Sequence, residues 1–277
     1  MPAKPALIID KNVLQGWSKQ RLADLADRFE LLMPDVLFFE LMSTGDHVAR
    51  ARCFSKLPGG ENPITLVEHL GAHLSHELTH QAPLGKPSTR RAVGRFRFNP
   101  LLSSADYRLP DEQMQATLER TEYLRQRSVE YLERARTAAD IVARRIAQTG
   151  EKRPAAFEAL REQVLDLEQM RDFISDFEAP EGEPRMPPTE NMDRSWAIFV
   201  HQVVAWLFAL DLAERRWSEL HQPGFAEANA VKLEHDVLDA EYLALGVLEG
   251  GLATHERKLR SWFRLLCPDG VLIPEAP

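Results

Sequence analysis

Short apolar runs alternate with amphipathic segments at the N-terminal end of the chain. Residues 6–9 read Ala-Leu-Ile-Ile and residues 30–33 read Glu-Leu-Leu-Met, and each run is typical of a short buried strand. A helix is predicted between them, from about Val13 to Phe29, and Pro34-Asp35 opens a second helix. Strand, helix, strand and helix in this order predict a parallel α/β sheet.

The C-terminal end shows the same alternation. The segment "AVKLEHDVLDAEYLALGVLEGG" predicts a helix, "GLAT" a strand, residues 256–265 a helix and "GVLI" a last strand. Neither end alone has enough strands to complete a sheet, so the two ends are expected to combine. We therefore predict one discontinuous α/β domain made of residues 1–57 and 226–277.

Residues 58–225 carry a helical pattern and are predicted to form a large all-helical insertion. Apolar positions recur at helical spacing over residues 111–148, and Thr149-Gly150 ends that helix. A second helix is predicted from about Pro154 to Phe177, so residues 111–177 are expected to form an antiparallel helical hairpin. The apolar segment from Trp196 to Leu212 is interrupted by polar residues and is shorter than a membrane span, so we predict a buried core helix.

Composition narrows the classes of protein. The 277 residues are 44% hydrophobic and carry a formal net charge of -8, which disfavours a protein that coats nucleic acid over its whole surface. Two distant cysteines give neither a disulfide framework nor a thiolate metal site. The N-terminus does not resemble a secretory signal. We expect a cytoplasmic protein that does not bind a membrane.

Acidic residues follow the predicted strands. Ligands of an open parallel sheet gather beyond the carboxyl ends of its strands, so carboxylates at these positions are expected to meet. Their mutual repulsion is relieved by one or two hard cations, Mg²⁺ or Mn²⁺, which suit phosphodiester hydrolysis. The acids in question are Asp10, Glu40, Asp236, Asp239 and Glu256.

These segments resemble the PIN-like nuclease family. The resemblance rests on "LIIDKNVLQ", "LLMPDVLFFEL" and "LDAEYLALGVLEGGLATHERKL", all at the two ends of the chain. It implies a Rossmann-like three-layer α/β/α domain and metal-dependent endonucleolytic cleavage of RNA. It also implies roles for single residues: Asp10, Glu40, Asp239 and Glu256 as the catalytic metal-site acids, Glu241 as the second acid of D-x-D after Asp239, Asp236 as a neighbouring metal-site acid, and Asn12 and Thr254 as polar support.

The chain departs from the family pattern in two places. Glu256 stands where the family usually has Asp, which adds a methylene to the metal ligand and puts activity in question. The separation of Glu40 from Asp239 is far longer than in a compact member of the family, which requires an inserted domain.

The segment "LSHELTHQA" contains the zinc-peptidase pattern H-E-x-x-H as His76-Glu77-Leu78-Thr79-His80. His69, His73, His76 and His80 form one stripe on the predicted helix. A catalytic zinc site also needs a third ligand, and no H-E-x-x-H-x-x-G-x-x-H extension follows. A zinc peptidase, a metal stripe and a plain polar helix face all remain open.

Residues 85–100, "GKPSTRRAVGRFRFNP", mix basic and aromatic side chains that could contact phosphates and stack on bases. A solvated loop is the alternative. The candidate substrate-binding residues are Lys86, Arg90, Arg91, Arg95 and Arg97.

The sequence therefore predicts a Mg²⁺- or Mn²⁺-dependent ribonuclease that acts on RNA and possibly on DNA. One alternative is a catalytically inactive PIN-like module that binds a protein partner, or itself, through the helical insertion. A less favoured alternative is the H-E-x-x-H zinc metallopeptidase.

Overall fold

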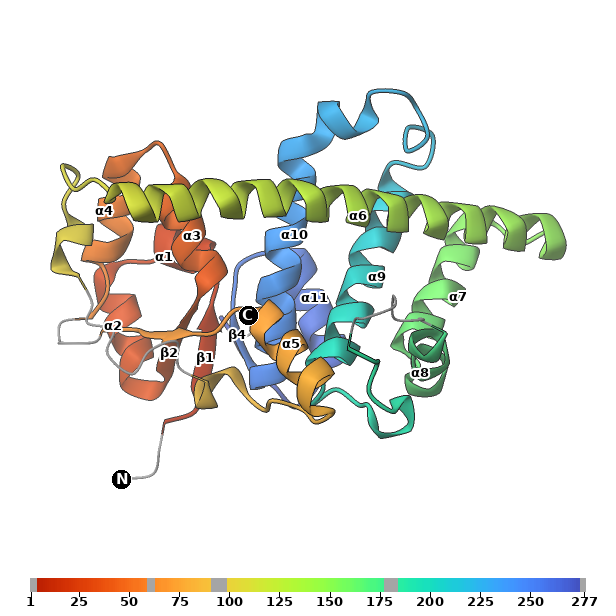
Figure 1. Cartoon of the computed structure of the whole chain (residues 1–277), viewed down its shortest axis with the longest axis horizontal. Coiled ribbons are helices and arrows are strands. Elements are labelled where there is room, and N and C mark those ends of the chain that lie inside the picture. Colours follow the sequence, from red (N-terminus) through yellow and green to blue (C-terminus); the bar gives the residue numbers. More distant parts are fainter. Residues whose placement is uncertain (1–3, 59–62, 91–98, 177–183, 275–277) are drawn as a thin grey trace. The chain divides into compact units, whose positions relative to one another are not determined.

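The computed structural model describes residues 4–58, 63–90, 99–176 and 184–274 (Figure 1). The chain forms two compact units. The first comprises Met1–His73, Gly85–Arg120 and Tyr242–Pro277, and the second comprises Leu74–Leu84 and Thr121–Glu241. Both ends of the chain thus belong to the first unit.

The first unit is built on a parallel sheet of five strands in the order β3-β2-β1-β4-β5. The central strand β1 pairs with β2 on one side and with β4 on the other, and these three lie side by side in Figure 1. The predicted union of the two chain ends in one parallel sheet is confirmed. The strands are β1 (Ala6–Ile9), β2 (Glu30–Pro34), β3 (Thr65–Val67), β4 (Gly251–Ala253) and β5 (Val271–Ile273).

The central strand of the sheet is buried, and a glycine allows the neighbouring strand β4 to approach it closely. Leu7, Ile8 and Ile9 of β1 are fully buried, as a strand covered on both faces requires. Gly251 lies so close to β1 that a Cβ atom there would stand 2.6 Å from the carbonyl oxygen of Ala6. Only glycine allows this close approach where β4 begins beside β1.

Helices connect the strands of the first unit. After β1 the chain forms two helices, α1 and α2, and the prediction of one helix from Val13 to Phe29 was wrong. The break falls at Trp17-Ser18, because the Ser18 hydroxyl accepts from the Arg21 N–H at 3.2 Å and begins a new helix. The helices are α1 (Lys11–Gly16), α2 (Lys19–Arg28), α3 (Asp35–Ser43), α4 (His47–Ser55) and α11 (Arg257–Leu266).

The second unit is helical. Its core is α9 (Ala197–Arg215), against which α7 (Arg153–Leu165) and α8 (Leu167–Ser175) pack. A single helix from Pro154 to Phe177 was predicted, and this was wrong, because the Asp166 carboxylate accepts from the Gln169 N–H at 2.9 Å and starts α8. Three further helices contribute residues to both units: α5 (Leu70–His80), α6 (Asp111–Thr149) and α10 (Phe225–Glu249).

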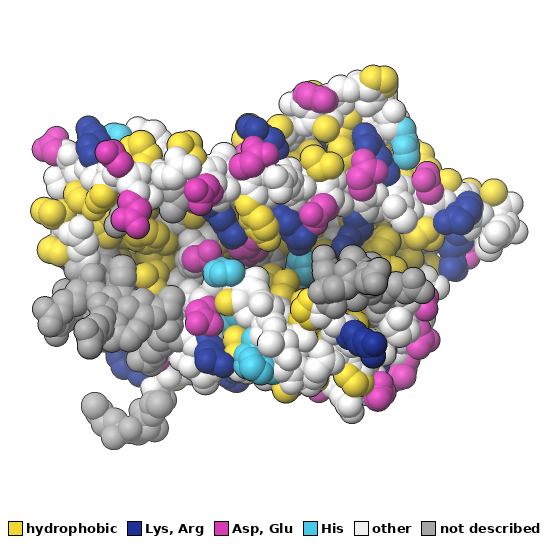
Figure 2. All heavy atoms as spheres, viewed as in Figure 1, with side chains coloured by type: hydrophobic (Ala, Val, Ile, Leu, Met, Phe, Trp, Pro, Cys, Tyr) yellow, Lys and Arg dark blue, Asp and Glu magenta, His cyan; other side chains and the backbone are white. Residues whose placement is uncertain are grey.

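The strand β3 lies within residues 58–225, the range that the sequence assigns to the helical insertion, and it pairs with β2. The long helix α6 matches its predicted bounds closely. Figure 2 shows acidic and basic side chains interspersed over it, and several form i,i+3 ion pairs such as Arg136 with Glu133 at 2.5 Å. Such pairs suit a helix face in contact with water.

Within the described residues, α9 is long and apolar enough by length and composition to cross a membrane. In this structure 78% of its most apolar window is buried inside the protein. The segment is therefore a largely buried helix here, as predicted from its interruption by His201 and Gln202.

Candidate functional site

Asp10 follows β1 directly and begins the site. It is the N-cap of α1, and its Oδ1 accepts from the Asn12 N–H at 3.4 Å. Its Oδ2 accepts from the Asn12 side-chain amide at 2.6 Å and from the Thr254 hydroxyl at 2.5 Å. Because β1 pairs with β4, the residues that follow the two strands meet although 244 positions separate them.

Burial changes the acidity of Asp10. The side chain is 4% exposed, and this desolvation raises the pKa of Asp10 from 3.8 to about 6. The bonds from Thr254 and Asn12 lower this pKa, and the negative charge of Glu40 raises it further. Asp10 and Glu40 are therefore near enough for each charge to oppose the other.

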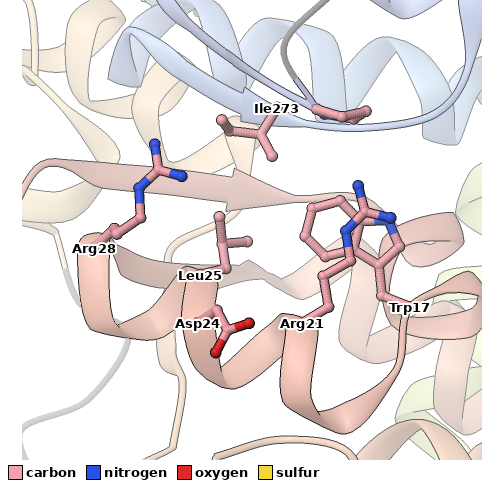
Figure 3. A pocket seen from close by; sticks show the side chains of 7 residues that line it. Trp17, Arg21, Asp24, Leu25, Arg28 and Ile273 are labelled. Atoms are coloured by element: carbon pink, nitrogen blue, oxygen red, sulfur yellow. The ribbon is translucent and has the colours of Figure 1, made fainter. Parts of the chain in front are cut away.

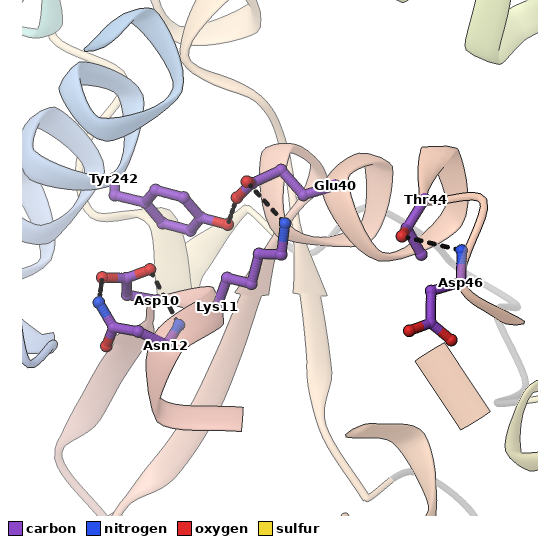
Figure 4. Close-up of polar contacts among 7 residues, drawn as sticks. All are labelled: Asp10, Lys11, Asn12, Glu40, Thr44, Asp46 and Tyr242. Atoms are coloured by element: carbon purple, nitrogen blue, oxygen red, sulfur yellow. Dashed lines mark hydrogen bonds and ion pairs between the residues drawn. The ribbon is translucent and has the colours of Figure 1, made fainter. Parts of the chain in front are cut away.

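Glu40 lies on α3 and has two polar partners (Figure 4). The Lys11 ammonium is 3.2 Å from its Oε1, and the Tyr242 hydroxyl donates to its Oε2 at 2.7 Å. Glu40 is 8% exposed, whereas Lys11 is 26% exposed. Lys11 thus supplies a positive charge to a nearly buried carboxylate from its solvent side.

A second chain of hydrogen bonds extends outward from Asp10. The side-chain oxygen of Asn12 accepts from the backbone N–H of His255 at 2.9 Å. The indole N–H of Trp17 donates to Nε2 of the same histidine. Sequence reasoning did not identify Trp17, His255, Lys11 or Tyr242, because their roles depend on contacts between distant segments that no local spacing reveals.

The other predicted acids are placed differently. Glu256 is the N-cap residue of α11, its carboxylate is exposed, and only its backbone N–H reaches the site, by donating to the Thr254 hydroxyl at 3.0 Å. Asp236, Asp239 and Glu241 belong to the second unit, and Asp236 lies 3.6 Å from Arg215 of that unit. Of the six predicted metal ligands, Asp10 and Glu40 are the two whose carboxylates interact within the first unit.

The predicted substrate-binding segment is described only in part. Lys86 approaches Gly250, at the amino end of β4, whereas Asp10 follows the carboxyl end of β1. The two residues thus lie at opposite ends of a parallel sheet. Arg90 is exposed. Arg91, Arg95 and Arg97 lie outside the described residues.

The H-E-x-x-H segment has a structural role in the second unit. Glu77 is 1% exposed, and its carboxylate accepts from the N–H groups of Ala197 at 2.7 Å and Ile198 at 2.8 Å. Glu77 therefore caps the N-terminus of α9, whose own N-cap residue Trp196 makes no side-chain cap bond. These contacts occupy the carboxylate that a zinc peptidase would direct at a metal-bound water.

The donor atoms can be compared with the needs of each metal. Among the residues that the structure describes, no group of three or more His, Cys, Asp or Glu side chains is arranged to hold a metal ion. A catalytic zinc site needs three protein ligands, and no such set is present in these residues. Mg²⁺ keeps several waters and needs only one or two carboxylates with substrate phosphates. Asp10 and Glu40 fit this smaller requirement once Lys11 leaves Glu40.

Comparison of the chain with protein-family models, with curated proteins and with solved structures found no match.

Proposed function

We propose that this chain is a PIN-like, metal-dependent ribonuclease whose metal site is centred on Asp10 and Glu40. The observation that carries the proposal is the arrangement around Asp10. A buried carboxylate at the end of the central strand is held by Thr254 and Asn12, within electrostatic reach of a second buried carboxylate. Two neighbouring carboxylates that repel each other are typical of a site that binds a hard cation.

The residues of this site have distinct roles in the proposed function. Asp10 and Glu40 would hold Mg²⁺ or Mn²⁺, which when bound activates a water and stabilises the leaving oxygen. Thr254 and Asn12 orient Asp10 by binding its Oδ2, while the Asn12 backbone N–H binds its Oδ1. Tyr242 orients Glu40 in the same way through Oε2. The raised pKa of Asp10 requires its deprotonation before a cation binds.

The arrangement of the strands also supports the proposal, although it is less specific than the side chains of the site. A parallel sheet assembled from both chain ends brings the segments "LIIDKNVLQ" and "GLATHERKL" to adjacent strand ends, as the resemblance to PIN-like nucleases requires. The resemblance also implies Asp239 and Glu256 as ligands, and this part of it stays a prediction. The exposed carboxylate of Glu256 would have to turn toward Thr254 to join the site.

A second function is favoured by one specific contact. The Lys11 ammonium already neutralises Glu40, so the acids need no divalent ion to coexist. In this alternative the chain is a catalytically inactive PIN-like module that binds a protein partner, or a second copy, through its helical insertion. The two functions differ in whether a divalent ion displaces Lys11.

The test is cleavage of a single-stranded RNA in Mn²⁺ by the wild-type protein and by Asp10→Asn, with a DNA of the same sequence in parallel. Asp10→Asn keeps the shape of the side chain but removes the charge that would bind metal. The ribonuclease proposal predicts cleavage that is lost in Asp10→Asn. Equal activity of the two proteins would point to a contaminant or another site, and no activity in either would favour the binding module.

A further inference from the structure

A pocket of about 300 Å³ opens in the first unit between α2 and the end of β5 (Figure 3). One wall is the face of α2 that carries Arg21, Asp24, Leu25 and Arg28, whose spacing of three or four residues places them along one side of the helix. The lining is completed by Trp17, Ile273 and Pro274. The pocket thus combines an apolar floor with charged groups at its rim.

The charges of this pocket are mainly positive. The Arg21 guanidinium stacks over the ring of Trp17, with Cζ 3.9 Å from the centroid. Arg28, about two turns further along the same face of α2, also borders the pocket, and both arginines are exposed. Asp24 stands between them and accepts from Gln20 at 2.8 Å. Arg21 over Trp17 and Arg28 over Phe29 present two guanidinium groups along one side of α2, and such groups are suited to binding phosphate.

The pocket is connected to the acidic site. Trp17 donates to the His255 ring, and the His255 backbone N–H donates to Asn12, which in turn holds Asp10. The Arg260 guanidinium donates to the Thr254 carbonyl at 3.1 Å. His255 thus joins the pocket to Asp10, through its ring on one side and its backbone N–H on the other.

We propose that the α2 pocket, lined by Trp17, Arg21 and Arg28, binds the phosphate backbone of single-stranded RNA next to the Asp10 site. This inference rests on the proposed function and names the surface that holds its substrate. Arg21 and Arg28 contact successive parts of the backbone, and Asp24 opposes the binding of this anion. The net charge of -8 confines such a contact to a local patch of this kind.

The experiment measures binding of a fluorescent single-stranded RNA to the full chain by anisotropy, in EDTA and over a series of KCl concentrations. Arg21→Ala and Arg28→Ala should each weaken binding and reduce the slope of log affinity against log salt by about 0.7. Asp24→Asn should strengthen binding, because it removes the repulsive charge. Opposite effects from neighbouring residues would not arise from a loss of folding.

Arg153→Ala is the matched control, since Arg153 is an exposed arginine placed 5.8 Å over Trp217 in the second unit. It should bind RNA like the wild type. Wild-type affinity and salt slope in Arg21→Ala would overturn the inference, and so would a wild-type protein without salt-dependent RNA binding. Displacement of the RNA by an acidic peptide at equal charge concentration would show that the pocket reads charge alone and would also overturn it.

The result can be separated from that for the proposed function. If wild-type and Asp10→Asn proteins cleave RNA equally in Mn²⁺ but the arginine-dependent slope holds, the nuclease proposal fails and the RNA-binding pocket stands. If cleavage requires Asp10 while Arg21→Ala leaves KM and binding unchanged, the pocket inference fails and the nuclease proposal stands.

Discussion

The Tyr242 hydroxyl donates a 2.7 Å hydrogen bond to Oε2 of Glu40, across 202 positions of sequence. The bond joins the part of α10 that belongs to the first unit to α3, and both side chains are buried. Since the other oxygen of Glu40 faces Lys11, this bond determines which way the carboxylate turns.

Tyr242→Phe should lower the free energy of unfolding by about 1 to 2 kcal/mol, because a buried carboxylate loses a donor. Urea unfolding of the full chain measures the change. In a Glu40→Ala background the same substitution should cost less, because the acceptor is already gone. Identical costs in the two backgrounds would mean that the bond contributes nothing to stability.

Lys11→Met should increase Mn²⁺ affinity by roughly fivefold, equivalent to about 1 kcal/mol. The substitution keeps a stem of similar length and removes the ammonium that competes with a cation for Glu40. Isothermal titration calorimetry with Mn²⁺ measures the effect. Lys19→Met, at an exposed lysine of α2, serves as the control and should leave the affinity unchanged. Weaker Mn²⁺ binding in Lys11→Met would contradict the competition between the two cations.

Asp10 should make stability depend on pH. Its pKa is about 6 in the folded chain against an ordinary value of 3.8, so the folded state holds a proton that the unfolded state releases. The stabilisation is complete below pH 3.8 and is lost as the pH rises through 6, by about 3 kcal/mol in all. The measurement compares wild type with Asp10→Asn between pH 4 and 7 in EDTA.

Only the difference between these two proteins isolates Asp10, since burial also raises the pKa of Glu77 and Glu249. The wild type should lose stability relative to Asp10→Asn as the pH rises. A constant difference over this range would mean that Asp10 titrates normally in the folded chain.

Glu77→Ala should destabilise the second unit by about 2 to 4 kcal/mol, because the N–H groups of Ala197 and Ile198 lose their acceptor. Glu77→Gln retains an acceptor oxygen and should cost less. Thermal unfolding measures both. His76→Ala and His80→Ala remove the side chains that a zinc site would need and should have small effects. Stoichiometric zinc in the purified protein, lost in the two histidine variants, would instead favour the peptidase.

The parallel sheet and the acids at its strand ends could be predicted from the sequence, because short local patterns indicate them. A buried apolar run ending at Asp10 predicts a strand end, and a second such run before Thr254 predicts its neighbour. The strand β3 was missed because three residues, Thr65–Val67, are too few to display a period. The helix break at Ser18 was missed because the hydroxyl cap is indistinguishable from a polar position inside an amphipathic helix.

The residues that contact these acids were harder to predict from the sequence. The sequence cannot show that Tyr242 rather than another residue of α10 meets Glu40, because the turn of α10 that faces α3 is set by tertiary packing. Lys11 was overlooked because a lysine at the start of a helix is ordinarily solvated, and only its 3.2 Å contact with Glu40 gives it a role. Glu77 matched a catalytic pattern, although its bonds to α9 are those of a helix cap.

Anomalous diffraction from crystals grown with Mn²⁺ would locate the divalent cation that Asp10 and Glu40 are proposed to share. We expect an anomalous peak within roughly 2.0 to 2.3 Å of carboxylate oxygens of both Asp10 and Glu40, with Lys11 moved off Glu40. No anomalous peak there at a saturating Mn²⁺ concentration, with the Lys11 ammonium still on Oε1 of Glu40, would contradict the proposed metal site.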